Sequence, residues 1–293
     1  MRSKSSARLA AGLFLLTVTV SVFAQTSRDD PIVGHSEGNH RLDCTIIRPW
    51  AGDGEPETIP AGGFQVIGWT NGWGQGNVFG ADQVENYVSG LYYWAEAGDF
   101  LVIAANQWSA RAPDILQCLQ WLIDASHDAG SDYFDAVDTS KIGLSGHSQG
   151  GGAALKAGDG VLHDGAGLAR ITTVVAMNPY GPSFVMAQNQ NDQILLLGGD
   201  RDGVTPTDSF SAVLDGVVLA ENPGGAQAEL VGGTHCNPAC RSGFGVFGEV
   251  SLLWWQIFLR DDVSRCADLV NLLEFGDEDW NTVYSRNFIC HGP

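Results

Sequence analysis

Short apolar runs that stop at glycine or polar residues alternate along the chain with stretches of helical periodicity. Runs of this length are typical of strands that are buried on both faces of a parallel sheet. We predict strands at 42–49, 64–68, 100–105, 141–144, 171–177, 193–197 and 228–231. Because helices separate these strands, the pattern predicts an α/β protein whose mainly parallel central sheet is flanked by helices.

The stretches between the strands include three with a clear apolar face, which we predict to be helices at 83–97, 113–129 and 247–259. In the second, Pro113 suits a first helical turn, and apolar residues recur at Ile115, Leu119 and Leu122. No repeat, low-complexity tract or linker divides the pattern, so we expect one domain at 25–293.

The first residues have the pattern of an export signal. Basic residues come first, at Arg2, Lys4 and Arg8, and the apolar stretch 9–20 that follows is too short to span a bilayer comfortably. Small or modest residues at 22 and 24 suit a cleavage site. We therefore expect residues 1–24 to be removed and the protein to be secreted, to the periplasm or the medium; the alternative is a retained anchor.

The formal charge of −19 comes from 34 acidic and 15 basic residues, and removal of the leader makes it −22. Only Lys141 and Lys156 would then remain as lysines. Binding to phosphate groups needs clustered Lys and Arg. The charge therefore argues against nucleic acid and anionic membranes as partners.

Six cysteines follow the leader, at Cys44, Cys118, Cys236, Cys240, Cys266 and Cys290. An even number in an oxidising compartment favours disulfides, with fifteen possible sets of pairs. His235, Cys236 and Cys240 loosely resemble a zinc site, but no second pair of ligands accompanies them. A calcium site on so acidic a surface is the alternative, but no ligand loop of recognisable spacing is present, so we expect no metal. We expect no cofactor either.

The strongest chemical signal is Gly146-x-Ser148-x-Gly150, which lies between the predicted strand at 141–144 and a run of small residues. In the α/β-hydrolase fold this motif forms a sharp strand-to-helix turn that exposes the serine, and glycine is needed where the turn crowds the backbone. The alternative is an ordinary glycine-rich turn. The context favours Ser148 as the nucleophile of a serine hydrolase with that fold.

A serine nucleophile needs a histidine base that is oriented by a carboxylate, and in this fold the chain order is Ser, acid, His. His235 follows the strand at 228–231 through a short glycine loop, so we predict that it is the base. After the strand at 193–197, Asp200 and Asp202 are both candidates for the acid. We favour Asp202, because it lies farther along the loop, and expect Asp200 to accept hydrogen bonds within a turn.

The oxyanion of the transition state should meet two backbone N–H groups. One belongs to Gln149, the residue after the nucleophile. The other is expected in the loop after the strand at 64–68, which indicates Trp69; this aromatic, glycine-rich loop also suits substrate binding. The segment 178–192 is short, so we expect no large lid and an open cleft that admits bulky esters.

At this point the sequence resembles the cutinase-like polyester hydrolases, which include the PET hydrolases, within the dienelactone-hydrolase-like branch of the α/β-hydrolases. The similarity runs from about residue 46 to 290 and rests on the motifs at 68–70, 142–152, 202–206 and 232–235. These motifs resemble the oxyanion loop, the nucleophile turn, the acid loop and the base loop of the family. The resemblance supports Asp202 over Asp200.

The resemblance also implies roles outside the triad. Tyr180 stands where the family carries a stacking tryptophan, so Tyr180 and Trp69 would flank the acyl group, and we add His147 to the expected substrate-binding residues. Gln149 replaces a usual methionine. The resemblance implies a disulfide between Cys266 and Cys290, and the interpretation adopted for the remaining cysteines is Cys44 with Cys118 and Cys236 with Cys240.

These observations predict a secreted, monomeric serine esterase that hydrolyses carboxylic esters through an acyl-enzyme, with a hydrophobic ester or polyester such as cutin or a PET-type polymer as substrate. The alternative within the hydrolases is a lipase, or a chlorophyllase-like esterase for small hydrophobic esters. A third hypothesis is a binding module of the same fold without catalytic activity.

Overall fold

The computed structural model describes residues 26–36, 40–49, 59–73, 83–107, 111–158, 161–163, 168–180, 193–209, 224–284 and 288–290 of the 293-residue chain. The expected leader at 1–24 lies outside these ranges, as does 181–192, on which the expectation of a missing lid depends.

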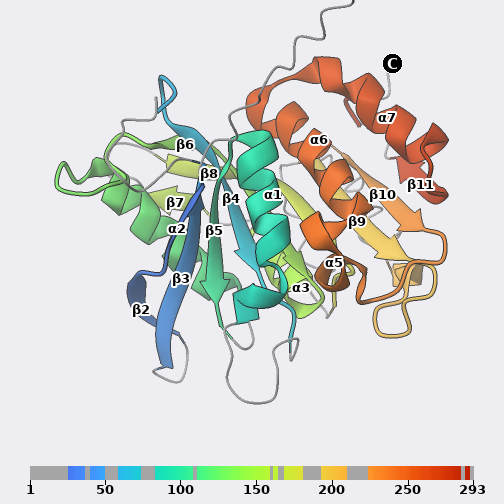
Figure 1. The fold of residues 1–293 in the computed structure, drawn as a ribbon, viewed down its shortest axis with the longest axis horizontal. Helices are drawn as coiled ribbons and strands as arrows, with labels where there is room; N and C mark the ends of the chain where they lie inside the picture. The colour runs from blue at the N-terminus through green and yellow to red at the C-terminus, as the bar shows by residue number, and fades with distance from the viewer. Residues whose placement is uncertain are drawn as a thin grey trace, which may run out of the picture.

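A mixed sheet runs through the described part of the chain (Figure 1). Its strands lie in the order β1 (Ser27–Asp29), β3 (His40–Arg48), β5 (Leu101–Asn106), β4 (Phe64–Thr70), β6 (Val137–His147), β8 (Leu168–Met177), β9 (Gln193–Gly199), β10 (Gly225–Leu230) and β11 (Trp280–Tyr284). Two short strands, β2 (Ile32–Ser36) and β7 (Val161–His163), pair antiparallel with β3 and β8. The pairs from β5 to β10 are parallel, whereas β3 and β11 run antiparallel to their neighbours.

The seven predicted strands correspond to β3, β4, β5, β6, β8, β9 and β10, which confirms the prediction of an α/β protein. β4 continues two residues beyond the predicted end, to Thr70, and this extension changes the position of the expected oxyanion loop. β11 was not predicted, because it is a short edge strand whose residues are half-buried or exposed, so it lacks the continuous apolar run of the central strands.

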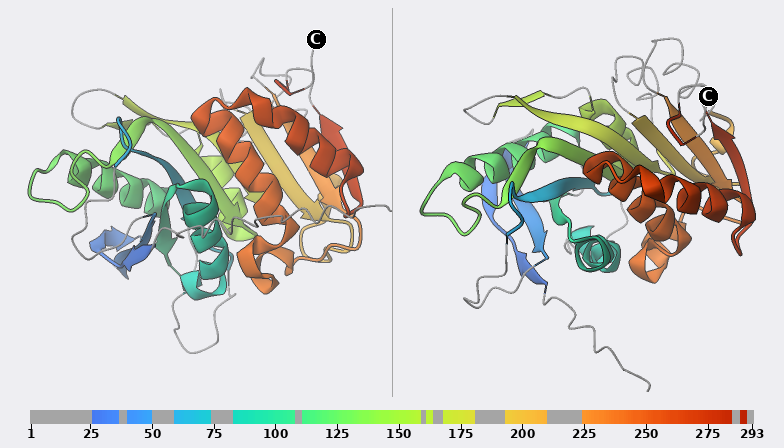
Figure 2. Two further views of the ribbon diagram at one scale, coloured as in Figure 1. Left: turned by 45° about the horizontal axis from the view of Figure 1, so that its top comes forward. Right: turned by 90° about the horizontal axis from the view of Figure 1, so that it is seen from above.

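Helices cover both faces of the sheet (Figure 2). On one face, α2 (Ala112–His127) and α3 (Gln149–Ala157) pack on an apolar cluster that includes Val66 and Leu144. On the other, α1 (Val88–Gly98), α6 (Val246–Arg260) and α7 (Cys266–Phe275) pack on a cluster that includes Ile67 and Trp69. Successive residues of β4 thus enter opposite cores, as the period of a strand requires.

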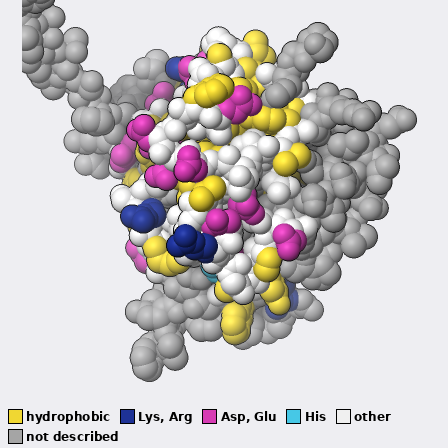
Figure 3. Space-filling view, turned by 90° about the vertical axis from the view of Figure 1, so that its right-hand side faces the viewer, with side chains coloured by type: hydrophobic (Ala, Val, Ile, Leu, Met, Phe, Trp, Pro, Cys, Tyr) yellow, Lys and Arg dark blue, Asp and Glu magenta, His cyan; other side chains and the backbone are white. Residues whose placement is uncertain are grey.

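Short helical segments complete the described ranges: η1 (Gln83–Asn86), η3 (Thr207–Ser209), α5 (Asn237–Cys240), η4 (Ser242–Phe244) and η5 (Val263–Arg265). None of the helices in these ranges has the length and apolar character that crossing a bilayer requires. Acidic side chains are spread over the described part of the face that lies at the right of Figure 1, as expected from the charge of −19 (Figure 3).

Three disulfides join the six cysteines in the pairs expected above: Cys44 with Cys118, Cys236 with Cys240 and Cys266 with Cys290. The first ties β3 to α2 across the buried core, and the third ties the start of α7 to the end of the described chain. The second lies within four residues of sequence, directly after His235.

We expect the double variant Cys44→Ala/Cys118→Ala to lose much more stability than Cys236→Ala/Cys240→Ala. The first disulfide spans 74 residues of sequence and the second spans 4. In the chain-entropy treatment a loop of the first length contributes about 4 kcal/mol to the free energy of unfolding, and one of the second length less than half of that. Guanidinium unfolding measures both losses, and equal losses would contradict the prediction.

Candidate active site

Ser148 occupies a strained backbone turn between β6 and α3. Its φ of 55° and ψ of −125° lie in a region that non-glycine residues rarely adopt. Hydrogen bonds on both sides of the residue hold this conformation: Ser148 N–H donates to the Met177 carbonyl, and the Ser148 carbonyl accepts from the N–H groups of Tyr180 and Gly152. The strain is therefore maintained by β8 and α3, and it sets the hydroxyl at the carboxyl edge of the sheet.

The glycines of the motif are required by close backbone contacts. A Cβ atom at Gly150 would lie 2.2 Å from the carbonyl oxygen of Thr70, and one at Gly146 would lie 2.5 Å from the carbonyl oxygen of Gly150. Such distances are far below van der Waals contact, so an alanine at Gly150 would push β4 away from the turn and one at Gly146 would push the start of α3 away.

The structure brings together Ser148, His235 and Asp202 from the loops that follow β6, β10 and β9. His235 Nε2 lies 2.9 Å from Ser148 Oγ, and His235 Nδ1 lies 2.7 Å from Asp202 Oδ2. Both distances are those of hydrogen bonds. Because parallel strands place their carboxyl ends at one edge, residues far apart in sequence meet there.

Asp202 is held by its own loop. Its Oδ1 accepts from the N–H groups of Val204 and Thr205, and its Oδ2 accepts from the Thr205 hydroxyl as well as facing His235. Burial opposes ionisation of this carboxyl group, but the hydrogen bonds from Thr205, His235 and Val204 outweigh it and lower the pKa of Asp202. Asp200 instead accepts a 2.6 Å hydrogen bond from the N–H of Gly232 in the His235 loop.

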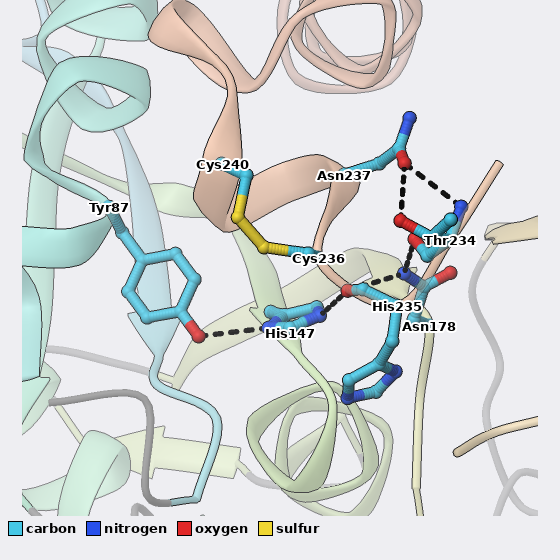
Figure 4. Close-up of a disulfide and its surroundings, with 8 residues drawn as sticks. All are labelled: Tyr87, His147, Asn178, Thr234, His235, Cys236, Asn237 and Cys240. Atoms are coloured by element: carbon cyan, nitrogen blue, oxygen red, sulfur yellow. Dashed lines mark hydrogen bonds between the residues drawn. A yellow bond between two sulfur atoms is a disulfide. The ribbon is translucent and has the colours of Figure 1, made fainter. Parts of the chain in front are cut away.

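The His235 loop is anchored by side chains from two directions (Figure 4). Asn178 Nδ2 donates to the carbonyl oxygens of Thr234 and His235, at 3.3 and 3.1 Å. On the other side, Asn237 Oδ1 accepts from both the N–H and the hydroxyl of Thr234. The disulfide of Cys236 follows at once. The backbone of the loop therefore has little freedom to move.

The expectation that Trp69 binds substrate and supplies an oxyanion donor is corrected by the structure. Its side chain is completely buried, stacks on Phe244 with ring centroids 4.9 Å apart, and donates from Nε1 to Asn71 Oδ1. Its backbone lies inside β4, which has paired strands on both sides, so its N–H faces the sheet. The cause is the extension of β4 to Thr70, because the loop that was expected to begin at Trp69 begins only at Asn71.

The expectation that His147 contacts substrate is also wrong. The side chain has no exposed surface, and its ring nitrogens bind protein groups: Nδ1 lies 2.8 Å from Tyr87 Oη, and Nε2 lies 2.7 Å from the His235 carbonyl oxygen (Figure 4). Burial, reinforced by the neighbouring His235, lowers the pKa of His147 to about 3. The imidazole is therefore neutral at ordinary pH.

A pocket of about 430 Å³ opens at Ser148, lined by Trp73, Ser148, Gln149, Tyr180, Val204 and His235. The structure thus places the expected residues Gln149 and Tyr180 beside the serine. Trp73 and Val204 were missed as site residues, although both are more than half exposed at the pocket. Trp73 belongs to the aromatic loop noted in the sequence, four residues beyond the tryptophan chosen there, and Val204 belongs to the acid loop.

Among the described residues, no group of three or more His, Cys, Asp and Glu side chains is arranged to hold a metal ion. The two histidines nearest Ser148 point their nitrogens at protein groups, as given above.

Comparison with protein-family models matches residues 100–270 to the PETase family, described as PET hydrolase-like. The match places the chain in a family of hydrolases and includes Ser148, Asp202 and His235, whereas the loop with Trp69 and Trp73 precedes it. Because the match covers more than half of the sequence, this chain belongs to the PET hydrolase-like family, which confirms the resemblance drawn from the motifs. A comparison with curated proteins found no match.

We expect His147 to make the protein less stable in acid. Its pKa is about 3 in the folded state and about 6.5 in an unfolded chain, so between these values only the unfolded state binds the proton. Stability contributed by the neutral ring is therefore complete above about pH 6.5 and is lost progressively as the pH falls towards 3. His147→Gln, which cannot titrate, should lose less stability than the wild type between about pH 7.5 and 4.5.

Urea unfolding at the two pH values measures this difference. His127→Gln is the matched control, because His127 is exposed at the end of α2 and its replacement should leave the wild-type loss unchanged. The same loss in His147→Gln as in the wild type would show that the buried ring does not contribute.

Proposed function

We propose that the protein is a secreted carboxylic-ester hydrolase of the α/β-hydrolase fold, which acts on hydrophobic or polymeric esters through an acyl-enzyme. The observation that carries the proposal is the continuous hydrogen-bond chain from Ser148 through His235 to Asp202, beside a pocket of about 430 Å³. Membership of the PET hydrolase-like family supports hydrolysis of an ester or polyester. The export pattern at 1–24 and three disulfides support secretion.

In the first half of the proposed reaction, His235 Nε2 takes the proton of Ser148 Oγ as this oxygen attacks the ester carbonyl carbon. Asp202 keeps the Nδ1 proton of the ring in place and stabilises the imidazolium that forms. The imidazolium then donates its proton to the departing alcohol, which leaves the acyl group on Ser148. In the second half, His235 activates a water molecule that attacks the acyl-enzyme, and the acid is released.

We assign the two oxyanion donors to the N–H groups of Gln149 and Trp73. Gln149 begins α3, so its N–H lies at the positive end of a helix beside the serine. The loop that follows β4 passes close to the nucleophile at Gly72, where a Cβ atom would lie 3.2 Å from Ser148 Cβ. The N–H of Gly72 donates to Tyr87 Oη, which leaves the next one, that of Trp73, as our choice.

The rim of the pocket supports a bulky hydrophobic substrate. Trp73, Tyr180 and Val204 expose 63%, 55% and 56% of their surface around the serine. Large exposed apolar side chains that gather at a site indicate a binding surface for apolar groups. Release of soluble acid from polyester films, measured beside short esters and triglycerides, would separate a polyester hydrolase from a lipase or a small-ester esterase.

Ser148→Ala should abolish hydrolysis, because no other group replaces the nucleophile. We expect kcat/KM for p-nitrophenyl butyrate to fall by about 10⁴-fold or more, and covalent labelling by a fluorophosphonate probe to disappear. If the variant kept wild-type activity, the proposal would be wrong. If purified wild-type protein were not labelled, a binding module without catalysis would replace the proposal.

The neighbouring carboxylates provide the matched controls for this test. Asp202→Asn should lower kcat by roughly 10²- to 10⁴-fold, because the ring of His235 loses its charged partner. Asp200→Asn should lower kcat far less, since Asp200 contacts the backbone of Gly232 rather than the ring. The reverse order would move the acid to Asp200.

Trp73→Pro should lower kcat by about 10²- to 10³-fold, because proline removes the N–H that we assign to the oxyanion. Trp73→Ala keeps this N–H and removes only the ring, so it should act mainly on KM. Steady-state kinetics of the two variants measures the difference. Equal values of kcat for proline and alanine would exclude Trp73 as the donor.

A further inference from the structure

Tyr87 and His147 form a buried polar pair beside the proposed catalytic residues. Neither belongs to the hydrogen-bond chain from Ser148 through His235 to Asp202. Tyr87, between η1 and α1, exposes 1% of its surface and His147 exposes none. Enclosing polar side chains is costly unless each polar atom is bonded. Here every ring nitrogen and the phenol oxygen has a partner: the two side chains bind one another, and their outer partners are the N–H of Gly72 and the carbonyl of His235.

The direction of each hydrogen bond follows from the groups involved. The His235 carbonyl oxygen can only accept, so His147 Nε2 carries the hydrogen. A neutral imidazole has one N–H, so Nδ1 accepts and the Tyr87 hydroxyl donates at 2.8 Å. Tyr87 Oη in turn accepts from the N–H of Gly72 at 3.2 Å. The result is one ordered path from Gly72 through Tyr87 and His147 to His235.

The two ends of this path are the parts of the backbone that the proposed reaction depends on. At one end, Gly72 lies against Ser148 and directly precedes Trp73, whose N–H we assign to the oxyanion. At the other end, the carbonyl group belongs to His235 itself. His147 and His235 also face one another with ring centroids 4.8 Å apart.

We propose that Tyr87 and His147 are positioning residues that set the loop at 71–73, to which we assign an oxyanion donor, and the loop of His235 relative to one another across Ser148. The inference rests on the proposed function of Ser148, His235 and Asp202. Its content is that the phenol and the imidazole act together on the geometry of the transition state, beyond their contribution to folding.

The surroundings of His235 explain why this contact matters for geometry. Asn178, Asn237 and the disulfide fix the loop before and after the residue, as described above (Figure 4). The bond from His147 reaches the His235 carbonyl from the side of Tyr87, whose hydroxyl accepts from the N–H of Gly72 (Figure 4). It therefore transmits the position of one loop to the other, and a displacement of about 1 Å in a catalytic group can cost 10²-fold in rate.

Tyr87→Phe removes one oxygen atom and breaks the path at its centre. We expect kcat for p-nitrophenyl butyrate to fall by about 10- to 100-fold, with KM changed by less than about threefold. The rate of fluorophosphonate labelling should fall by a similar factor, because labelling reports attack by Ser148 without the later deacylation step.

Tyr133→Phe is the matched control for the loss of a buried hydroxyl. Tyr133 is 5% exposed, and its hydroxyl donates to Asp29 of β1, an edge strand that β3, β5 and β4 separate from β6. This variant should lower the melting temperature by a comparable amount and keep kcat within about twofold of the wild type, because the hydroxyl it removes does not adjoin the site.

Two variants of His147 provide an independent measurement if Tyr87→Phe does not fold. His147→Gln keeps one donor and one acceptor, as in the neutral ring, whereas His147→Phe keeps the ring shape and removes both. We expect the glutamine variant to retain at least about tenfold more kcat than the phenylalanine variant, when both are measured below their melting temperatures.

Each outcome decides between the two proposals. Full kcat in Tyr87→Phe, or equal kcat in His147→Gln and His147→Phe, would overturn the positioning role while an inactive Ser148→Ala leaves the catalytic assignment intact. Activity that survives in Ser148→Ala, or wild-type protein that resists the fluorophosphonate, would overturn the proposed function itself. A fall of kcat in Tyr87→Phe but not in Tyr133→Phe supports the positioning role.

Discussion

The strained turn at Ser148 is the constraint on which the rest of the structure depends. A serine with φ of 55° and ψ of −125° stores strain of about 1–3 kcal/mol, so its surroundings must supply the compensation. They do so through β8, which accepts from Ser148 N–H, and through the Tyr180 N–H, which donates to the Ser148 carbonyl. The hydroxyl can then face the histidine of the loop after β10, because these contacts with β8 and with the segment after it hold the turn.

The same constraint explains the buried aromatic side chains next to the turn. Gly150 touches the backbone of Thr70, so the end of β4 must be as rigid as the turn it supports. The side chain of Trp69 supports the end of β4, because it packs on Phe244 and Tyr87. It also donates to Asn71, which in turn donates to the Ala105 carbonyl. A tryptophan that sequence reasoning placed in the site thus supports the loop that carries Trp73.

The sequence was sufficient for the features that follow from local pattern and chain order. Apolar runs predicted the central strands, the glycine motif indicated Ser148, and chain order then indicated His235 and the loop with Asp200 and Asp202. The position of Asp202 in that loop and the resemblance favoured it, and the structure places the three residues within hydrogen-bonding distance. The strand end at Thr70 could not be predicted, because Gly68 resembles a strand terminator and gave no sign that the pairing with β5 and β6 continues. Tyr87 gave no signal either, since its partners Gly72 and His147 lie 15 and 60 residues away.

Two histidines with rings 4.8 Å apart show how the environment assigns their roles. A histidine that takes up a proton during catalysis needs an anionic partner for the imidazolium, and His235 has one in Asp202 at 2.7 Å. His147 meets a phenol and a carbonyl, and burial makes its charged form costly. The ring of His147 is therefore confined to one tautomer and can hold a position, whereas the ring of His235 has the anionic partner that its proposed role as base requires.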